Sequence, residues 1–228
     1  EGTKIAFGYR CSTPEKERQV ADKILEVKNT YQVDVFGVCG DISVEEDINN
    51  IVRDTLAHFG RIDILVNNAA IWPTSYVQEM EKEEWDKTIE TNLTGPFLLC
   101  RSMVQLWLEA NQKGKIINVV SQAAFNGSTS GHAHYAASKA GLVALGISLA
   151  REVAQHGITV NSVAPGMMHT LMSQKVLQER LNDYLSRIPL GRIAEPEEVA
   201  YSVAFLASDK ADYITGATIN VTGGMLIH

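Results

Sequence analysis

The sequence lacks the features of several classes of protein. None of its apolar runs approaches the roughly 20 residues that a membrane-spanning helix needs, so we expect no membrane partner. Basic residues are not in excess, because 20 Lys and Arg stand against 27 Asp and Glu, for a formal net charge of −7 at pH 7. Nucleic acids and anionic membrane surfaces attract proteins through a basic field, so this acidic balance argues against both as partners.

Cysteine is also scarce, and the start of the sequence has no basic leader followed by an apolar stretch, so we expect no signal peptide. Cys11, Cys39 and Cys100 are odd in number and widely separated, which indicates reduced thiols in the cytoplasm rather than a disulfide framework. His132 and His134 lie close together. No third ligand lies nearby and the cysteines lack metal-ligand spacing, so we expect no metal site.

What the sequence has instead is an alternation of short strand-like runs with longer segments of helical period. This alternation is typical of a parallel sheet wrapped by helices, and 228 residues with 45% apolar side chains suffice for one compact core. With no repeat or linker, we predict a single domain over residues 1–228. The predicted strands are residues 4–9, 33–38, 62–66, 115–120, 159–163 and 218–221, and the predicted helices are residues 13–29, 43–59, 81–111, 134–156, 171–186 and 195–208.

Three local patterns refine these elements. Ser43-Val44-Glu45-Glu46 has the form of a capping box, with a hydroxyl at the N-cap and a carboxylate three residues later. The apolar run 62–66 is continuous, as expected of a strand buried on both faces. Gly95-Pro96 interrupts the segment 81–111, which we therefore expect to form a helix in two pieces.

Tyr135 and Lys139 form the most informative polar pair. Four positions apart on a predicted helix, they lie on one face about one turn apart. A nearby ammonium lowers a tyrosine pKa from its usual value of about 10, which makes the phenol a usable proton donor near neutral pH. Many surface helices carry such a pair by chance, so its context decides. Ser121 follows a predicted strand, where open α/β sheets present ligand-binding residues, and Asn92 precedes the Gly-Pro break, where its amide can hold a water.

Six ordered motifs carry a family resemblance across the whole chain. They are Asn67-Asn68-Ala69-Ala70, Thr91-Asn92-Leu93-Thr94-Gly95, Ser121, Tyr135-Ala136-Ala137-Ser138-Lys139, Val160-Asn161-Ser162-Val163-Ala164-Pro165-Gly166 and Asn220-Val221-Thr222-Gly223-Gly224. Together they resemble the short-chain dehydrogenase/reductase family, and residues 204–208 and 213–216 are most similar to its β-ketoacyl-[acyl-carrier-protein] reductase branch. The resemblance implies an α/β fold with a Rossmann-type, doubly wound parallel sheet. It also implies an oxidoreductase that moves a hydride between nicotinamide and a carbonyl or secondary alcohol.

The resemblance assigns a role to each catalytic candidate. Tyr135 is expected to be the general acid in carbonyl reduction and the base in alcohol oxidation, while Ser121 orients and polarises the carbonyl oxygen. Lys139 is expected to lower the pKa of Tyr135 and to bind the nicotinamide ribose hydroxyls. Asn92 is expected to hold a water that links Lys139 to solvent as a proton relay.

Cofactor contacts follow from the same resemblance. Asp41 and Ile42 match the position that contacts the adenine ring, although Asp41 also fits an ordinary helix-entry residue beside Ser43. The cofactor is expected to be NADP(H), with NAD(H) possible as an alternative, because the strand end where NAD-preferring relatives carry an Asp holds Tyr9 followed by Arg10, whose guanidinium suits a 2′-phosphate. The remaining expected contacts are Asn68, Ala69 and Ala70 at the adenosine ribose, Tyr135 and Lys139 at the nicotinamide ribose, and Pro165, Gly166, Met168 and Thr170 at the nicotinamide carboxamide.

Substrate and assembly are expected from resemblance as well. The nearest substrate class is a 3-oxoacyl thioester on acyl carrier protein, as in fatty acid biosynthesis, and helices 90–111 and 134–156 correspond to those that pair in homotetramers. Ile71-Trp72-Pro73-Thr74 departs from the reductase pattern, which usually has a polar segment with an Arg, so a sugar, polyol or other small alcohol is the alternative. A non-catalytic nucleotide-sensing protein is a third, less favoured, hypothesis.

Several apolar residues around the candidate site leave two interpretations open. The set Trp72, Pro73 and Tyr76 forms either a pocket wall or loop packing, and His132 and His134 line the substrate mouth or cap the helix. The set Met167, Met168, Leu171, Met172 and Val176 forms either a lid over substrate or part of the core.

The family pattern begins earlier than this sequence does. Related enzymes start with a strand, a Gly-rich turn and a helix, whereas residues 1–4 match the approach to the second strand. We therefore expect the domain to be N-terminally incomplete in this sequence, with about 25 residues of a βαβ unit, including the phosphate-binding Gly loop, preceding it.

Overall fold

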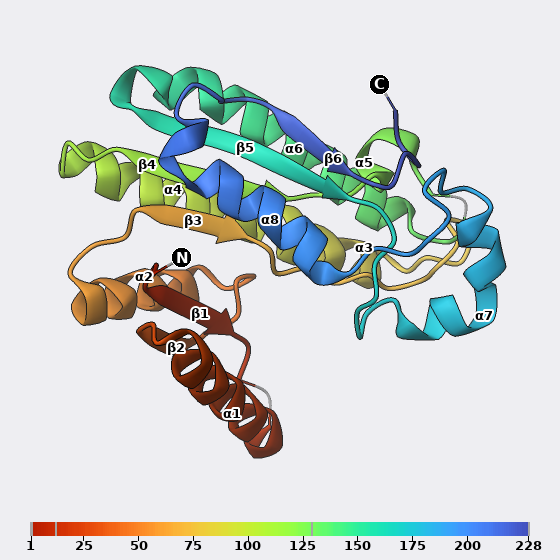
Figure 1. Cartoon of the computed structure of the whole chain (residues 1–228), viewed down its shortest axis with the longest axis horizontal. Coiled ribbons are helices and arrows are strands. Elements are labelled where there is room, and N and C mark those ends of the chain that lie inside the picture. The colour runs from red at the N-terminus through yellow and green to blue at the C-terminus, as the bar shows by residue number, and fades with distance from the viewer. Residues whose placement is uncertain (1, 12, 129, 228) are drawn as a thin grey trace.

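The computed structural model describes residues 2–11, 13–128 and 130–227 (Figure 1). Residues 1, 12, 129 and 228, which fall within the predicted domain, lie outside this described part. The strands are β1 (Ile5–Tyr9), β2 (Val35–Cys39), β3 (Ile64–Asn67), β4 (Gly114–Val119), β5 (Ile158–Pro165) and β6 (Thr218–Val221). The helices are α1 (Pro14–Tyr31), α2 (Glu45–Phe59), α3 (Lys82–Ile89), the π-helix η1 (Glu90–Thr94), α4 (Gly95–Glu109), α5 (Ala123–Asn126), α6 (Ala133–Val153), α7 (Gln174–Leu185) and α8 (Pro196–Ala207), with short 3-10 turns η2 (Ala154–His156) and η3 (Asp209–Ala211).

All of these strands pair in parallel. Within the described residues they form two sheets, one of β1 and β2 and one in the order β3-β4-β5-β6. The register aligns the strand ends, with Tyr9 opposite Cys39, Asn67 opposite Asn118, and Val119 opposite Val163. The alternating parallel α/β fold is therefore confirmed, and all the carboxyl ends within a sheet meet at one edge.

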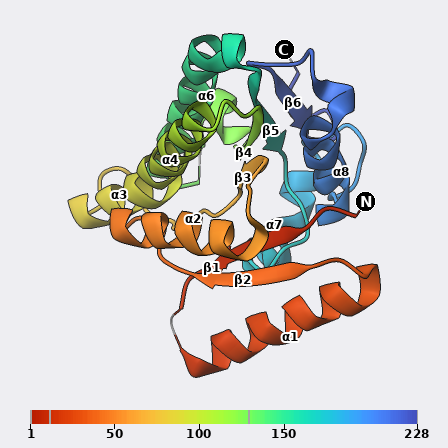
Figure 2. The ribbon, with the colours of Figure 1, turned by 90° about the vertical axis from the view of Figure 1, so that its left-hand side faces the viewer.

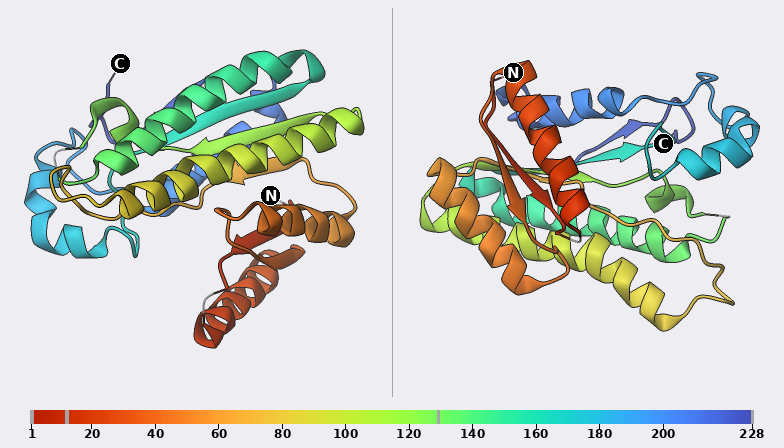
Figure 3. Two further views of the ribbon diagram at one scale, coloured as in Figure 1. Left: turned by 180° about the vertical axis from the view of Figure 1, so that it is seen from behind. Right: turned by 90° about the horizontal axis from the view of Figure 1, so that it is seen from below.

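Helices cover both faces of the four-stranded sheet (Figure 2). α4 and α6 pack on one face, whereas α8 contacts β4, β5 and β6 from the other. The β1–β2 pair lies between α1 and α2, and α2 also contacts α4 (Figure 3). None of the helices described combines the length and apolar character that a membrane crossing requires.

The prediction that residues 62–66 are buried on both faces is wrong. In β3, Ile64 and Leu65 are only partly buried, and Val66 keeps 40% of its surface exposed. The physical reason is position, because β3 is an edge strand of the described four-stranded sheet and pairs there with β4 alone. Ile64 still reaches the apolar cluster beneath α8.

The helix starts obey local rules to different degrees. At α1 they hold, since the Thr13 hydroxyl accepts from Lys16 N at 3.3 Å and Pro14 begins the first turn. The capping box at α2 is wrong, because the N-cap residue is Val44 and makes no side-chain cap bond. The Ser43 hydroxyl instead donates to Asp41 Oδ1 at 2.7 Å, so a charged acceptor outside the helix takes the hydroxyl.

The predicted break within residues 81–111 lies earlier than expected. α3 continues into the π-helix η1, and Gly95-Pro96 forms the first turn of α4 rather than the interruption. A Cβ added at Gly95 would lie 2.6 Å from the Ile42 carbonyl oxygen. The glycine therefore allows the start of α4 to approach the loop that follows β2.

The prediction of three reduced thiols is wrong for two of them. Cys11 and Cys39 form a disulfide with a Cα–Cα distance of 5.6 Å across a sequence separation of 28 residues. Parallel pairing of β1 with β2 brings the carboxyl ends of these two strands side by side, although Cys11 and Cys39 are far apart in the sequence. Cys100 remains a free, buried thiol, and burial raises its pKa to about 12.

Trp107 anchors the core between α4 and the sheet. Its side chain is fully buried among residues that include Met103, Ile116 and Ile158, and its indole nitrogen donates to the Ile62 carbonyl at 2.8 Å. A Cβ built on Gly114 would lie 2.4 Å from this ring. Gly114 therefore leaves the space that the indole fills.

Replacing Gly114 with Ala should destabilise the fold by about 1–3 kcal/mol, because the fixed Trp107 ring must move to admit one methyl group. Urea unfolding followed by indole fluorescence measures the change. Gly8→Ala in β1 is the matched control, since nothing lies within 4 Å of its added Cβ. Equal unfolding midpoints for the Gly114→Ala protein and wild type would contradict the proposed packing constraint.

Candidate active site

The site is built where β4 and β5 end side by side. Val120 N donates to Val163 O at 2.8 Å, and Gln122 N donates to Pro165 O at 3.0 Å, so the chain beyond β4 follows the end of β5. Ser121 lies between these two bonds. The structure thus places Ser121 just after β4, as predicted, and brings it next to Pro165.

Tyr135 comes to the same place from the first turn of α6. The Ser121 hydroxyl hydrogen-bonds the Tyr135 phenol. Burial raises the pKa of Tyr135 above its ordinary value, and the hydrogen bond with Ser121 offsets part of that increase. In this state the phenol holds its proton and is set up as a donor.

Lys139 lies one turn further along α6 and is only 2% exposed. Its ammonium donates to the Val119 carbonyl at 2.8 Å and lies 5.8 Å from the centroid of the Tyr135 ring. Burial lowers the pKa of Lys139 to about 8. The prediction that Lys139 lowers the pKa of Tyr135 is wrong for this arrangement, because burial dominates at both groups and the ammonium is turned toward the backbone carbonyl.

Asn92 is fully buried in the π-helix η1 and joins three segments. Its Oδ1 accepts from Ile71 N at 2.8 Å, and its Nδ2 donates to Ile71 O at 2.9 Å and to Ser138 Oγ at 3.2 Å. The Ser138 hydroxyl in turn donates to the Tyr135 carbonyl at 2.7 Å. The Asn92 side chain therefore ties the loop after β3 to the helix that carries Tyr135, while the water relay expected of Asn92 stays a prediction.

Ser138 is a residue that the sequence did not single out, although it lies inside the Tyr135–Lys139 motif. It is fully buried and links Asn92 to the α6 backbone. The available signal was a polar residue inside this motif, three positions after Tyr135 on the same helix. Its role depends on a partner 46 residues away, which spacing on one helix does not indicate.

Trp72 and His132 form a stacked pair beside Tyr135. Their ring centroids are 4.4 Å apart, and the Trp72 and Tyr135 rings are 6.3 Å apart. His132 Nδ1 donates to the Pro73 carbonyl at 2.7 Å, and burial lowers the pKa of His132. Trp72 thus both packs the loop and lies near the site, whereas Tyr76 is 50% exposed.

The two histidines at the start of α6 differ from the interpretations made from the sequence. The His134 side chain is completely buried, and its Nε2 lies 3.1 Å from Glu84 Oε1 on α3. The helix α6 has His132 at its N-cap position without a side-chain cap bond. Neither histidine caps the helix, and no group of three His, Cys, Asp or Glu residues in the described part of the chain is placed to hold a metal ion.

Arg10 and Asp41 meet beyond the ends of β1 and β2. Arg10 Nε lies 3.0 Å from Asp41 Oδ2, and the Arg10 side chain is 65% exposed. Burial alone would raise the pKa of Asp41, but hydrogen bonds from Ser43 and the charge of Arg10 outweigh it and hold that pKa below its usual value. Asp41 N also donates to Asp47 Oδ2 in the first turn of α2, so the helix-entry interpretation of Asp41 applies as well.

The segment after β3 and the segment after β5 complete the row of strand ends. Asn68, Ala69 and Ala70 follow Asn67, whose buried amide donates to Asn118 Oδ1 at 2.9 Å on the neighbouring strand. Gly166 N donates to Val221 O at 2.9 Å, which fixes the chain as it leaves Pro165.

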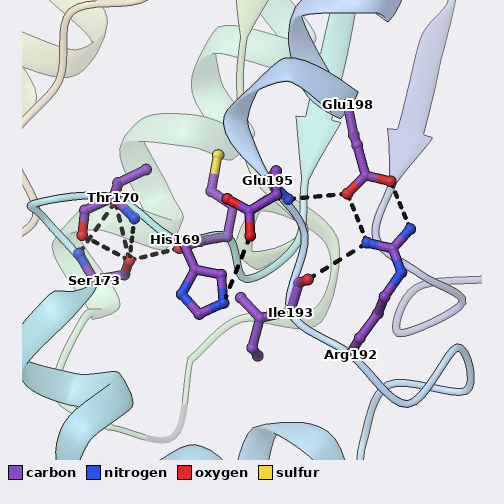
Figure 4. Close-up of polar contacts among 8 residues, drawn as sticks. His169, Thr170, Ser173, Arg192, Ile193, Glu195 and Glu198 are labelled. Carbon is purple, nitrogen blue, oxygen red and sulfur yellow. Dashed lines mark hydrogen bonds and ion pairs between the residues drawn. The ribbon is translucent and has the colours of Figure 1, made fainter.

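Hydrogen bonds of Ser173 hold the segment that carries Thr170 in a turn (Figure 4). Its hydroxyl donates to Met168 O at 2.6 Å, and Thr170 N donates to Ser173 Oγ at 3.0 Å. Met167 and Val176 pack with the apolar cluster around Leu177, so the core interpretation holds for them. Leu171 is 94% and Met172 49% exposed, and a lid formed by them stays a prediction. Nearby, the two terminal nitrogens of Arg192 donate to the Glu198 carboxylate oxygens at 2.7 and 2.6 Å, and this ion pair supports the loop before α8.

The polar and charged groups of the site fit a dinucleotide. An exposed guanidinium at Arg10 suits a phosphate, a carboxylate at Asp41 suits hydroxyl or amino groups, and the buried ammonium of Lys139 lies beside a phenol. The close approach of Gly95 to Ile42 connects the Arg10–Asp41 end with the helix that carries Asn92. These residues can hold a nucleotide at one end and move a proton at the other.

Sequence comparisons with known proteins show the family of the chain. A family model described as Enoyl-(Acyl carrier protein) reductase matches residues 1–226. The 3-oxoacyl-[acyl-carrier-protein] reductase FabG of Staphylococcus aureus is 38% identical over 225 residues, which cover 99% of this chain and 89% of that protein. The enzymes of the same name from Vibrio cholerae and Salmonella typhimurium are 42% and 41% identical over 189 residues, covering 83% of this chain and 77% of each relative. The resemblance predicted from the motifs is confirmed: the chain belongs to the short-chain dehydrogenase/reductase family, whose members are oxidoreductases acting on hydroxyl and keto groups.

Proposed function

We propose that this protein is an NADP(H)-dependent reductase of 3-oxoacyl thioesters carried on acyl carrier protein. The observation that carries the proposal is the Ser121 hydroxyl on the Tyr135 phenol, with the Lys139 ammonium buried behind the ring. The names of the relatives from Staphylococcus aureus and Vibrio cholerae support the thioester substrate. A purely nucleotide-sensing protein would not need this arrangement of proton donors.

Tyr135 is the proton donor in the proposed reaction. The bound nicotinamide supplies the hydride, and the residues of the chain supply placement and the proton. The substrate carbonyl oxygen lies within reach of the Ser121 and Tyr135 hydroxyls, which polarise it and hold it in position. As the oxygen gains negative charge, the phenolic proton of Tyr135 passes to it and completes the alcohol.

Lys139 compensates the charge that this step leaves behind. When Tyr135 loses its proton, the phenolate lies close to the buried ammonium, and the two opposite charges stabilise each other in a site with little water. We assign Asn92 the water through which a proton returns from solvent. In the same proposal Lys139 also binds the nicotinamide ribose.

The cofactor lies along the row of strand ends in this proposal. Arg10 binds the 2′-phosphate, and Asp41 and Ile42 lie against the adenine ring. The other proposed contacts are Asn68, Ala69 and Ala70 at the adenosine ribose and Pro165, Gly166, Met168 and Thr170 at the nicotinamide carboxamide. A homotetramer paired through α4 and α6 is the proposed assembly.

One observation favours a second substrate class. The stacked Trp72–His132 pair places aromatic surface 6.3 Å from Tyr135, and no basic residue lies within Ile71-Trp72-Pro73-Thr74. An NAD(P)-dependent dehydrogenase of a sugar, polyol or other small alcohol would use the same Ser121, Tyr135 and Lys139. Only the substrate would differ.

Substitution of Tyr135 with Phe should lower kcat for carbonyl reduction by about 10²- to 10⁴-fold, because it removes the proposed general acid while keeping the ring. Steady-state oxidation of NADPH measures this. Tyr31→Phe, which changes a 68% exposed tyrosine at the end of α1, is the matched control and should leave kcat unaltered. Full activity of the Tyr135→Phe protein would remove Tyr135 from the mechanism.

The rate of reduction should also fall as the pH rises through about 8, the lowered pKa of Lys139. Below that pH the ammonium is charged and stabilises the phenolate, and above it the charge is lost. The pKa of Tyr135 is raised, so its phenol stays protonated on the acid side and adds no limb there. A profile of kcat against pH measures this fall. The Lys139→Arg protein keeps its positive charge to higher pH, so the fall in its kcat should shift to higher pH. A wild-type profile that stays flat through pH 8 and well above it would contradict this role.

Substrate class is decided by matched assays on the wild-type protein. We expect NADPH-dependent turnover of a short 3-oxoacyl thioester and a much lower kcat/KM for an enoyl thioester. Oxidation of polyols with NADP⁺ or NAD⁺ should be slower still. Good activity on a polyol with none on the 3-oxoacyl thioester would establish the second class instead.

A further inference from the structure

The disulfide lies at the cofactor end of the chain, on both sides of the Arg10–Asp41 ion pair. Cys11 directly follows Arg10, and Cys39 precedes Asp41 by two residues. The strand register places Tyr9 opposite Cys39, and Gly40 N donates to Tyr9 O at 2.9 Å. The two strand ends are therefore already parallel and adjacent where the sulfur atoms meet.

The two cysteines lie at a separation that a disulfide can span. Their Cα–Cα distance of 5.6 Å is within the usual disulfide range. Both cysteines are exposed, so small thiols can reach them, whereas Cys100 is 2% exposed. Exposed disulfides are the class that responds to thiol reagents.

The disulfide also restricts the backbone on which Arg10 depends. The β1–β2 ladder fixes Tyr9 on one side of Arg10, and the bond to Cys39 fixes Cys11 on the other. Asp41, the partner of the guanidinium, is itself held by the Ser43 N–H at 3.0 Å and the Ser43 hydroxyl at 2.7 Å. Asp41 contacts the Nε of Arg10, and the Arg10 side chain stays 65% exposed, so the guanidinium remains accessible to a ligand.

We propose that Cys11 and Cys39 are a reversible redox site that tunes recognition of the nucleotide 2′-phosphate through Arg10. This rests on the proposed function insofar as Arg10 is the residue that meets the phosphate. The disulfide pre-organises Arg10 and so favours binding of the phosphate-bearing cofactor. Reduction releases the segment after β1, and Arg10 then loses conformational freedom only when it binds.

The redox step uses a small-molecule disulfide as the oxidant and a small-molecule dithiol as the reductant. In oxidation, one cysteine thiolate attacks the small disulfide, forms a mixed disulfide and releases one small thiol. The second cysteine thiolate then attacks the mixed disulfide, closes the Cys11–Cys39 bond and releases the second small thiol. The protein loses two protons and two electrons, and the oxidant gains them.

The test compares NADPH and NADH binding by the full chain after treatment with oxidised glutathione or with dithiothreitol. Fluorescence titration gives each Kd without turnover, and thiol counting under native conditions gives the redox state. We expect no accessible thiol in the oxidised protein and two in the reduced protein. The Kd for NADPH should be about three- to tenfold lower in the oxidised protein, the range that ordering one long side chain accounts for, with little change for NADH.

Two variants make the test specific. Cys39→Ser should show the weaker NADPH binding of the reduced protein whichever reagent is used, while its Kd for NADH stays at the wild-type value. Arg10→Ala should form the disulfide normally but show no dependence of NADPH binding on redox state. An Arg10→Ala protein that keeps the full redox effect would overturn the proposed route through Arg10.

The outcomes separate this proposal from the proposed function. Equal NADPH affinity in the two redox states, with the thiol counts as expected, would overturn the redox proposal and leave the reductase intact. Two accessible thiols that persist after oxidation would overturn it as well. Absence of NADPH binding in either state would overturn the cofactor assignment, and with it the proposed link to Arg10.

Discussion

The site depends on one buried amide. Asn92 satisfies both backbone groups of Ile71 and reaches Ser138 on α6, so its side chain joins the loop after β3 to this helix. Without these bonds, polar groups in a buried region would be left unpaired, at about 1–3 kcal/mol each. The π-helix η1 is the local deviation that holds Asn92 in place, and such single-turn π segments commonly mark functional sites. The position of Tyr135 is therefore set from outside α6 as well as by α6 itself.

Burial acts on the two ionisable partners in a way that couples them. It raises the pKa of Tyr135 and lowers that of Lys139, so each group taken alone is pushed toward its neutral form. A phenolate on Tyr135 and an ammonium on Lys139 are each expensive alone and favourable together. Below about pH 8 the Lys139 amine is charged, so the ion pair forms when the proton leaves Tyr135. The lowered tyrosine pKa expected from spacing alone omits the cost of desolvation, which is the larger effect here.

Local rules predicted much of the molecule from its sequence. The alternation of strands and helices, the strand ends that carry Ser121 and Asn68, and the pairing of Tyr135 with Lys139 on one helix face all follow from periodicities of two and 3.6 residues. Partners outside the local pattern were not predictable in this way. Ser138 depends on Asn92, Cys11 bonds to Cys39, and Ser43 binds Asp41 in place of capping α2. In each case a contact between segments far apart or outside the motif competed with the local pattern and won.

The charges at the ends of β1 and β2 explain why a small restraint there matters. Arg10 and Asp41 nearly cancel when seen from a distance, so their pair offers little net attraction to a phosphate in water. Attraction becomes strong only at contact, where the terminal nitrogens of the guanidinium can face the phosphate while Asp41 stays on the Nε side. In the proposed cofactor site, discrimination between a 2′-phosphate and a 2′-hydroxyl would therefore depend on orientation more than on net charge. A covalent link at the residue next to Arg10 acts directly on that orientation.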